Sequence, residues 1–253
     1  MTTDPGRDTT SHAIDDIVAI RNRWHTKRHP LFTDLASGKL DLRVLGIYMA
    51  QHAKFVRIAY QGFGLIITRA SNDVQGMIIE NLAEEEGLLA GPDGEAHNHM
   101  QMIFDFCDAA GMTREEVLGV EPSAAWWGRS LYYRLVCETE PVGAALAMMA
   151  TQEGQMPELN GEITIPALVG HYGFTRASKE IRFFVEHEVA DVEHSQKQLE
   201  LCARHLDSPA DQDRARIVAD ESCRLRWEAT SDTYRTEALG ETNFPPPELR
   251  ATA

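Results

Sequence analysis

Apolar residues recur every three to four positions along almost the whole chain, and no segment shows the strict alternation of a half-buried strand. The longest example is DLRVLGIYMAQHAKFVRIAYQGFGLIITRA (residues 41–70), which predicts one long helix with Asp41 as its N-cap. Further helices are expected at about 13–29, 73–89, 95–110, 123–137, 141–165, 176–206 and 210–238. The pattern therefore predicts an all-α fold, a single bundle of seven to nine helices.

The chain shows no internal repeat and no linker that would separate two domains. Residues 1–12 are polar and predict a flexible N-terminal tail, and residues 13–240 are expected to form the helical domain. Residues 241–253 contain the run NFPPPELRATA and predict a proline-rich C-terminal tail.

The charge balance excludes two classes of partner. The 253 residues include 39 acidic and 24 basic side chains, which gives a formal net charge of -15. Such a surface repels phosphate backbones and anionic lipids, so we expect no nucleic acid and no membrane as partners. The N-terminus lacks the apolar segment of a secretory signal, and the four cysteines are scattered without a CxxC pair. We therefore expect a cytoplasmic protein with reduced, buried cysteines.

Two histidines and an aspartate share one face of a predicted helix. In the stretch FFVEHEVADVEHS, His187, Asp191 and His194 lie four and then three residues apart, which stacks them over two turns. The same face continues to Phe184 and Leu201, whereas the intervening glutamates point elsewhere and are expected to be solvated. A buried carboxylate costs several kcal/mol unless it is paired or bound to a cation. The stripe is therefore either part of a metal site or a solvated polar face.

A further carboxylate stands on an apolar helix. Glu153 lies in ALAMMATQEGQM, and the positions one and two turns before it are Met149 and Leu146, so its side chain is expected to point inward. A lone inward glutamate is seldom found without a partner. The alternative to a metal site is a salt bridge to an arginine such as Arg134.

Acidic and histidine residues also meet at a predicted helix end. The segment NLAEEEG (residues 81–87) places three glutamates where the helix dipole favours cations. His99 begins a face with Ile103 and Phe106 and is expected to point inward, whereas His97 is expected to be exposed. Oxygen and imidazole ligands without thiolate suit iron or manganese better than structural zinc. In helix bundles, such sets hold two metals.

The succession NLAEEEG, HMQMIFDFCDAAGM, QEGQMPE and HEVADVEH resembles the haem-oxygenase-like dimetal oxidases, relatives of the thiaminase TenA and the quinone synthase PqqC. The resemblance covers residues 24–206 and includes the early segment HPLFTDLASGKL. It implies a haem-oxygenase-like fold and the ligand order Glu, His, Glu and His-x3-Asp-x2-His. The segment before His99 is longer than in the family, which leaves Glu84 and His97 as alternatives for the first two ligands. Carried over residue by residue, the implied metal ligands are Glu85, His99, Glu153, His187, Asp191 and His194.

The resemblance also implies the chemistry. It predicts two Fe(II) ions, with manganese as the alternative metal, O2 as co-substrate, a homodimer, and no catalytic residue beyond the ligands. Desaturation, C–C cleavage and oxygenation of a small molecule in a natural-product pathway are the implied reactions. Gln51 and His52 interrupt the apolar stripe of the long second helix, which favours an amino acid as substrate, with Tyr48 and Gln51 as candidate contacts. The alternatives are a fatty-acid oxidative decarboxylase, a metal-free TenA-like protein and a helical scaffold protein.

Overall fold

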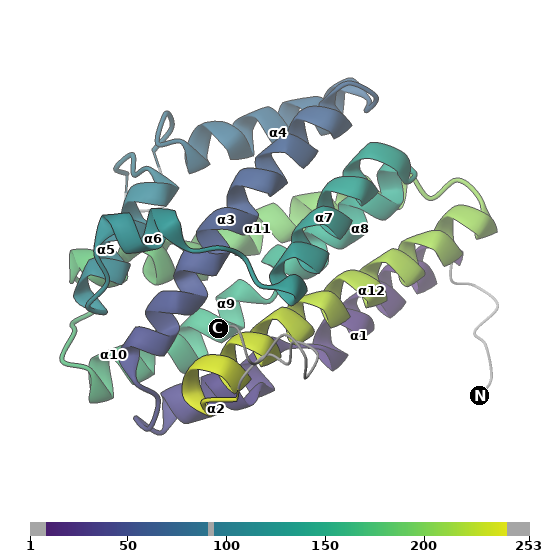
Figure 1. Cartoon of the computed structure of the whole chain (residues 1–253). Coiled ribbons are helices and arrows are strands. Elements are labelled where there is room, and N and C mark those ends of the chain that lie inside the picture. The colour runs from purple at the N-terminus through teal and green to yellow at the C-terminus, as the bar shows by residue number, and fades with distance from the viewer. Residues whose placement is uncertain (1–8, 91–93, 242–253) are drawn as a thin grey trace.

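The computed structural model describes residues 9–90 and 94–241, and within these ranges every regular element is helical. The helices pack into one bundle (Figure 1), which confirms the predicted fold class. Eight of them have eleven residues or more: α1 (Thr9–Arg23), α3 (Leu42–Ile67), α4 (Asn72–Glu85), α5 (His99–Ala109), α7 (Ala124–Thr139), α8 (Val142–Glu153), α11 (Arg182–Arg204) and α12 (Pro209–Thr233).

The first predicted helix differs from the structure at both ends. Helix α1 begins at Thr9, inside the predicted N-terminal tail, and ends at Arg23 rather than near residue 29. The chain turns here because two histidines act as caps: His25 accepts the N–H of Lys27 at the start of the turn η1 (Thr26–Arg28), and His29 caps the next helix. Residues 1–8 and 242–253, which make up most of the two predicted tails, lie outside the described residues.

Three short helices were not predicted: α2 (Pro30–Ala36), α6 (Arg114–Gly119) and α10 (Ile165–His171). The helix predicted over 141–165 is interrupted after Glu153 and continues as the short helix α9 (Met156–Glu158). Pro166 was expected to break a helix, but it occupies the first turn of α10, where proline is tolerated. The π-helical turn η2 (Leu159–Thr164) leads directly into that helix. The turns η3 (Lys179–Ile181) and η4 (Tyr234–Ala238) begin and extend the two long C-terminal helices.

Other helix starts lie at or within one residue of their predicted positions. The carboxylate of Asp41 accepts the N–H of Arg43 at 2.9 Å and caps α3. Ser123 caps α7 by accepting the N–H of Trp126, and Pro141 precedes the first residue of α8. These local interactions fix where the long helices of the bundle begin.

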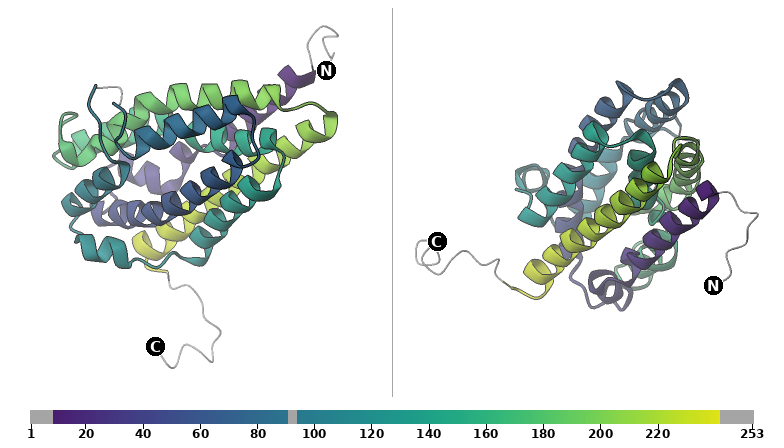
Figure 2. Two further views of the ribbon diagram at one scale, coloured as in Figure 1. Left: turned by 90° about the horizontal axis from the view of Figure 1, so that it is seen from above. Right: turned by 90° about the vertical axis from the view of Figure 1, so that its right-hand side faces the viewer.

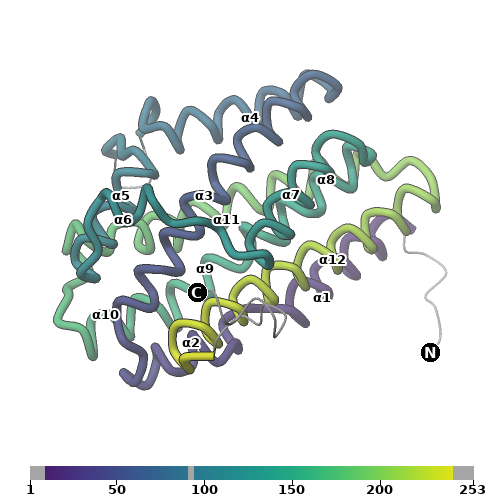
Figure 3. The backbone as a smooth tube through the Cα atoms, in the orientation of Figure 1, coloured from purple at the N-terminus to yellow at the C-terminus, as the bar shows by residue number. Residues whose placement is uncertain are grey.

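Helix α8 forms the centre of the bundle. Its residues from Gly143 to Gln152 are all buried, as expected for a helix that is apolar on every side. It packs against α1, α7, α11 and α12, and Figure 3 shows α7 and α8 running beside α12. A Cβ atom at Gly143 would lie only 2.5 Å from the carbonyl oxygen of His205, so the absence of a side chain allows this close approach. Glu153 therefore stands at the end of the most enclosed helix.

The remaining helices surround this centre. Helices α1 and α12 lie side by side although they come from opposite ends of the chain, and α4 lies alongside α11 (Figure 2). Trp126, Phe32, Phe106 and Phe183 are the largest fully buried side chains and join these layers. The four cysteines are free and buried, as the sequence predicts. In the described ranges, no helix has the length and apolar character that a bilayer crossing requires.

Candidate metal centre

Six side chains from four helices form two adjoining clusters with the composition of metal sites. Within each cluster, one potential ligand atom from each residue lies within 4.8 Å of the others. Helix α11 contributes to both clusters because His187, Asp191 and His194 share one face. We name them the α5 cluster, which consists of Glu85, His99 and His187, and the α8 cluster, which consists of Glu153, Asp191 and His194.

The backbone between α4 and α5 brings Glu85 and His99 together. Helix α4 ends at Glu85, and the chain turns away two residues later at Gly87, whose φ of 67° is favourable only for glycine. A Cβ atom at this position would come within 2.9 Å of the backbone of residues 97 and 98, so this segment returns directly over the helix end. Asn98 then caps α5 by accepting the N–H of Gln101. His99, the first residue of α5, is thereby held against the last residue of α4.

In the α5 cluster, two imidazoles face one carboxylate. Nδ1 of His99 contacts Oε2 of Glu85, and Nε2 of His187 lies 3.8 Å from Oε1 of the same carboxylate. Nδ1–H of His187 donates to the carbonyl oxygen of Phe183 at 2.7 Å, which leaves Nε2 available as a ligand atom. His99 is 5% exposed, and its Nε2 atom is buried without a partner among the described residues. A buried imidazole with this environment fits a metal ligand.

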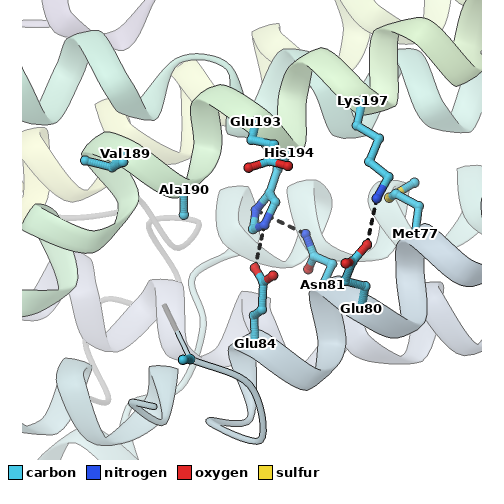
Figure 4. Close-up of a pocket in the computed structure, with 10 residues that line it drawn as sticks. Met77, Glu80, Asn81, Glu84, Val189, Ala190, Glu193, His194 and Lys197 are labelled. Carbon is cyan, nitrogen blue, oxygen red and sulfur yellow. Dashed lines mark hydrogen bonds and ion pairs between the residues drawn. The ribbon is translucent and has the colours of Figure 1, made fainter. Parts of the chain in front are cut away.

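In the α8 cluster, His194 is held from both sides of its ring. Nδ1 lies 3.5 Å from Oδ1 of Asp191, and Nε2–H donates to Oε2 of Glu84 at 2.7 Å. Figure 4 shows how the ring reaches from α11 to Glu84 and Asn81 on α4. The Glu153 carboxylate accepts the amide N–H of Gln198 at 2.6 Å. Glu84 therefore orients a residue of the second cluster, whereas Glu85 belongs to the first.

Protons compensate the charges of these clusters when no cation is bound. Burial raises the pKa of Glu153 to about 8, and the nearby Asp191 carboxylate adds to this effect. Burial alone would lower the pKa values of the two α11 histidines, but the surrounding carboxylates raise them to about 9 for His187 and about 10 for His194. Burial also opposes ionisation of Glu85, yet His99 and His187 hold its pKa well below the usual value.

The donor set and its surroundings fit a pair of iron ions. Three carboxylates and three imidazoles without thiolate are typical ligands of non-haem iron and manganese. Glu85 and Glu153 are the last residues of α4 and α8, so the negative ends of two helix dipoles converge here. Two carboxylates at two helix C-termini are unfavourable together unless positive charge lies between them.

Three neighbouring predictions are corrected by the structure. His97 was expected to be exposed, but its side chain is only 12% exposed and contacts Arg182 and Glu186. Glu186 was expected to be solvated, yet its side chain is only 13% exposed. Its Oε1 lies 3.5 Å from Nε2 of His97, which precedes α5. Arg134, the alternative partner of Glu153, instead pairs with Glu138 one turn along α7 at 3.7 Å.

A cavity of about 90 Å³ lies against the two clusters. Its apolar wall includes Phe55, Phe63, Tyr133 and Phe183, and His52 lies between this wall and His99. The ring of Phe183 lies 4.2 Å from that of His187 and 4.9 Å from that of His99, so it shields both imidazoles from solvent. Glu85, His99, Glu153, His187 and Asp191 all line this cavity.

The two predicted substrate contacts lie elsewhere. Tyr48 is buried between Phe32 and Trp126 and lines a smaller cavity of about 20 Å³, next to the main one. Gln51 is 9% exposed and is not among the residues that line either cavity. Neither residue therefore faces the metal clusters directly.

Two buried arginines line the cavity and were missed from the sequence. Arg129 is 5% exposed and Arg226 is 3% exposed, and both face the main cavity. Helical spacing contained the signal for Arg129, because it lies three residues after Trp126 and four before Tyr133, both buried aromatic positions. Arg226 stands in the same way between Ser222 and Ala229 on the buried face of α12.

Proteins of known sequence and structure resemble this chain over most of its length. The 4-aminobenzoate synthase of Chlamydia muridarum is 24% identical over 193 residues, which cover 76% of this chain and 78% of that protein. The 4-aminobenzoate synthase of Nitrosomonas europaea is 23% identical over 230 residues, 87% and 89% of the two chains. A solved domain of unknown function with a haem oxygenase-like fold, from Shewanella denitrificans, has a TM-score of 0.71 at 16% identity and covers 94% of this chain and 100% of its own.

A TenA homologue from Pseudomonas syringae pv. tomato has a TM-score of 0.70 at 16% identity, covering 89% of this chain and 92% of its own. These structures establish the haem-oxygenase-like fold that the sequence motifs implied. The model of the family described as iron-containing redox enzymes matches residues 47–227, well over half of the chain. The protein therefore belongs to this family of iron-containing redox enzymes.

Proposed function

We propose that the protein is a non-haem diiron enzyme that uses O2 to oxidise a small polar metabolite, an amino acid or a related compound. The observation that carries this proposal is the pair of three-residue clusters, which four helices bring to one cavity within an iron-containing family. The proposed ligands are those named from the sequence. Iron is favoured by the family, and manganese would fit the same donors.

Bound ferrous ions would supply the electrons and the open coordination position that O2 activation requires. The chain's own residues prepare the site for this chemistry. Phe183 covers the imidazoles of His99 and His187 and keeps water away from them. Tyr60 places its hydroxyl 3.5 Å from Oε2 of Glu85, and the Phe183 carbonyl fixes the ring orientation of His187.

The names of the relatives favour a second candidate function. Proteins that are 23–25% identical to this chain are called 4-aminobenzoate synthases, so formation of an aromatic amino carboxylate is a candidate reaction here. The cavity walls of Phe55, Tyr133 and Phe183 would accept an aromatic ring. A long fatty acid is disfavoured, because the cavity is small and contains two charged arginines.

A metal-free, thiaminase-like activity is also disfavoured. Such an activity would require a cysteine nucleophile, which reacts as the thiolate. Burial raises the pKa of Cys107 and Cys137 to about 12, so both stay protonated near neutral pH. Four free cysteines are consistent with a reducing compartment, and the proposal includes a cytoplasmic enzyme of a natural-product pathway.

Anaerobic Fe(II) loading followed by rapid mixing with O2 tests the proposal. We expect about two Fe per chain, and an O2 reaction that depends on the presence of an amino acid or aromatic substrate. His194→Ala should bind about one Fe and lose at least roughly a thousandfold in turnover while retaining its helix content. Glu193→Ala is the matched control, because Glu193 is exposed on the same helix. Full O2 consumption by His194→Ala would disprove the assignment.

A further inference from the structure

The cavity beside the metal clusters contains two buried cations without a counter-ion. Arg129 and Arg226 are the two buried arginines of the described chain, and neither forms an ion pair with any described carboxylate. Arginines that do form ion pairs lie nearer the surface, as Arg214 does with Glu140. Buried charges are normally paired, so this arrangement requires an explanation.

Arg129 is held in place by neutral groups only. Its guanidinium lies 3.8 Å from the ring centroid of Phe55 and 5.1 Å from that of Trp126, and Nη2–H donates to Oε1 of Gln152 at 3.3 Å. Its Nε and Nη1 atoms are buried and have no hydrogen-bond acceptor. The aromatic contacts therefore orient the group and leave two of its donor nitrogens unused.

Arg226 shows the same pattern from the opposite helix. Nη1–H donates to the backbone carbonyl of Gln152, and Nη2 lies 3.0 Å from the sulfur of Met156, a weak acceptor. Its Nε atom has no partner, and the same is true of the side-chain Nε2 of Gln152. All three residues line the main cavity, so it contains four buried nitrogen donors that lack an acceptor.

The electrostatics of the cavity call for an anion. Burial, together with the nearby Arg226, lowers the pKa of Arg129 to about 9, which shows that the two like charges interact. The carboxylates that line the cavity, Glu85, Glu153 and Asp191, all belong to the metal clusters. If two ferrous ions occupy these clusters as proposed, their four positive charges exceed the three negative ligand charges. The guanidiniums would then add two further positive charges.

We infer that Arg129, Arg226 and the side-chain amide of Gln152 form a binding subsite for the carboxylate group of the substrate. The guanidinium fork matches the two oxygens of a carboxylate and supplies charge-assisted hydrogen bonds. Because Gln152 directly precedes Glu153, the subsite adjoins the α8 cluster and directs the remainder of the substrate toward the proposed metals. That the bound acid is a substrate rests on the proposed function, whereas the anion site itself rests on the unpaired donors.

Paired ligands with and without the carboxylate test the subsite in the full-length protein. The probes are 4-aminobenzoate with 4-aminobenzamide, L-tyrosine with L-tyrosinamide, and octanoate with octanamide, titrated calorimetrically into the metal-free and the anaerobic Fe(II)-loaded protein. We expect at least one acid to bind roughly ten- to hundredfold more tightly than its amide, because a charge-assisted contact is lost in the amide. Equal affinity within all three pairs would overturn the inference.

Arginine variants then locate the site. Arg129→Gln and Arg226→Gln should each weaken binding of the preferred acid roughly ten- to hundredfold and leave its amide unaffected. Arg134→Gln is the matched control, since Arg134 lies on the same helix as Arg129, is 42% exposed and pairs with Glu138. An effect of Arg134→Gln as large as that of Arg129→Gln would overturn the inference. Circular dichroism checks folding, and if both Gln variants unfold, the acid-versus-amide comparison in the unmodified protein decides.

Iron binding separates this inference from the proposed function. We expect Arg129→Gln and Arg226→Gln to bind as much iron as the unmodified protein, because neither residue belongs to the two clusters. If the unmodified protein binds no iron but still prefers an acid over its amide, the proposed function fails and the carboxylate subsite stands. If iron binds and no acid is preferred, the subsite fails alone.

Discussion

The two walls of the cavity bury charge in different ways. On the wall formed by α4, α5, α11 and the end of α8, the carboxylates and imidazoles of the clusters face groups of complementary character, as Asp191 faces His194 at 3.5 Å and Glu153 accepts the amide N–H of Gln198. On the wall formed by α7 and α12, Arg129 and Arg226 face aromatic rings, a sulfur atom and neutral oxygens. The first wall can balance its own charge with protons, whereas the second has no internal means of doing so.

This difference indicates what each wall is built to receive. The first wall is built to receive cations, because metal ions can displace the protons that its ligands hold in the metal-free protein. A pair of guanidiniums with unused donors is preorganised for an anion, and the cost of burying it is offset only when that anion arrives. The two walls should therefore respond differently to pH, to loss of a charged side chain and to reorientation of a single ring.

The largest expected effect is the opposite pH dependence of the two walls. With pKa values of about 8 for Glu153, 9 for His187 and 10 for His194, the metal-free clusters hold about three protons near pH 7 that iron must displace. Iron affinity should therefore fall steeply, by up to roughly a thousandfold per unit, as pH decreases below about 7. Raising the pH removes these protons in turn and should strengthen iron binding.

Binding of a carboxylate should show the reverse trend. The pKa of Arg129 is lowered to about 9, so its guanidinium is charged near pH 7. This charge is lost as the pH rises through about 9. Acid affinity should consequently be constant between about pH 6 and 8 and decrease above about 9. Acid affinity that rises above about pH 9 would contradict this account of the arginines.

Calorimetric Fe(II) titrations in buffers of different ionisation enthalpy measure the protons that iron binding releases from the clusters. A release near zero would contradict the account of the clusters.

Stability of the metal-free protein offers a second test. Asp191→Ala removes the carboxylate that faces His194 and that raises the pKa of both α11 histidines, so we expect a loss of about 3 kcal/mol in the free energy of unfolding. Arg129→Met replaces an unpaired buried cation by an apolar chain and should be neutral or stabilise by about 1 kcal/mol. Urea unfolding of both variants without metal measures the difference. Equal destabilisation would mean that Arg129 is as well compensated as Asp191.

Much of the fold and of the cluster positions could be predicted from the sequence, for reasons of local physics. Helical periodicity shows which positions face inward, so Asp191 and His99 were expected on buried faces, where the structure places them. The Asp41 cap was predictable because a cap involves only neighbouring residues. The end of the first helix at Arg23, just before the His25 cap, was not predictable in this way, since histidine seldom caps helices.

Long-range partners could not be predicted in the same way. The inward position of Arg129 follows from its spacing, but whether a carboxylate lies opposite depends on how α7 and α12 pack against α8. The same limit explains why the burial of His97 and Glu186 was not predicted, because these residues come from distant segments and shield each other from solvent. A single sequence shows which faces are buried, whereas the pairing of those faces is a property of the tertiary structure.

The smallest expected effect concerns Glu84, which acts on the α8 cluster only through His194. Its carboxylate accepts Nε2–H at 2.7 Å and so turns Nδ1 toward Asp191. Glu84→Gln keeps the size of the side chain but removes its charge, and should weaken binding of one of the two irons roughly ten- to hundredfold.

Glu80→Gln is the control for this prediction, because Glu80 lies one turn earlier on α4 and pairs with Lys197 at 2.6 Å (Figure 4). An anaerobic Fe(II) titration with two resolved binding phases measures the effect. Only one of the two phases should shift in Glu84→Gln, because the α5 cluster uses Glu85 instead. If both phases shift equally, the two glutamates act as one acidic patch and not as a ligand and a positioning residue. If neither phase shifts, the orientation of His194 depends on Asp191 and Asn81 alone.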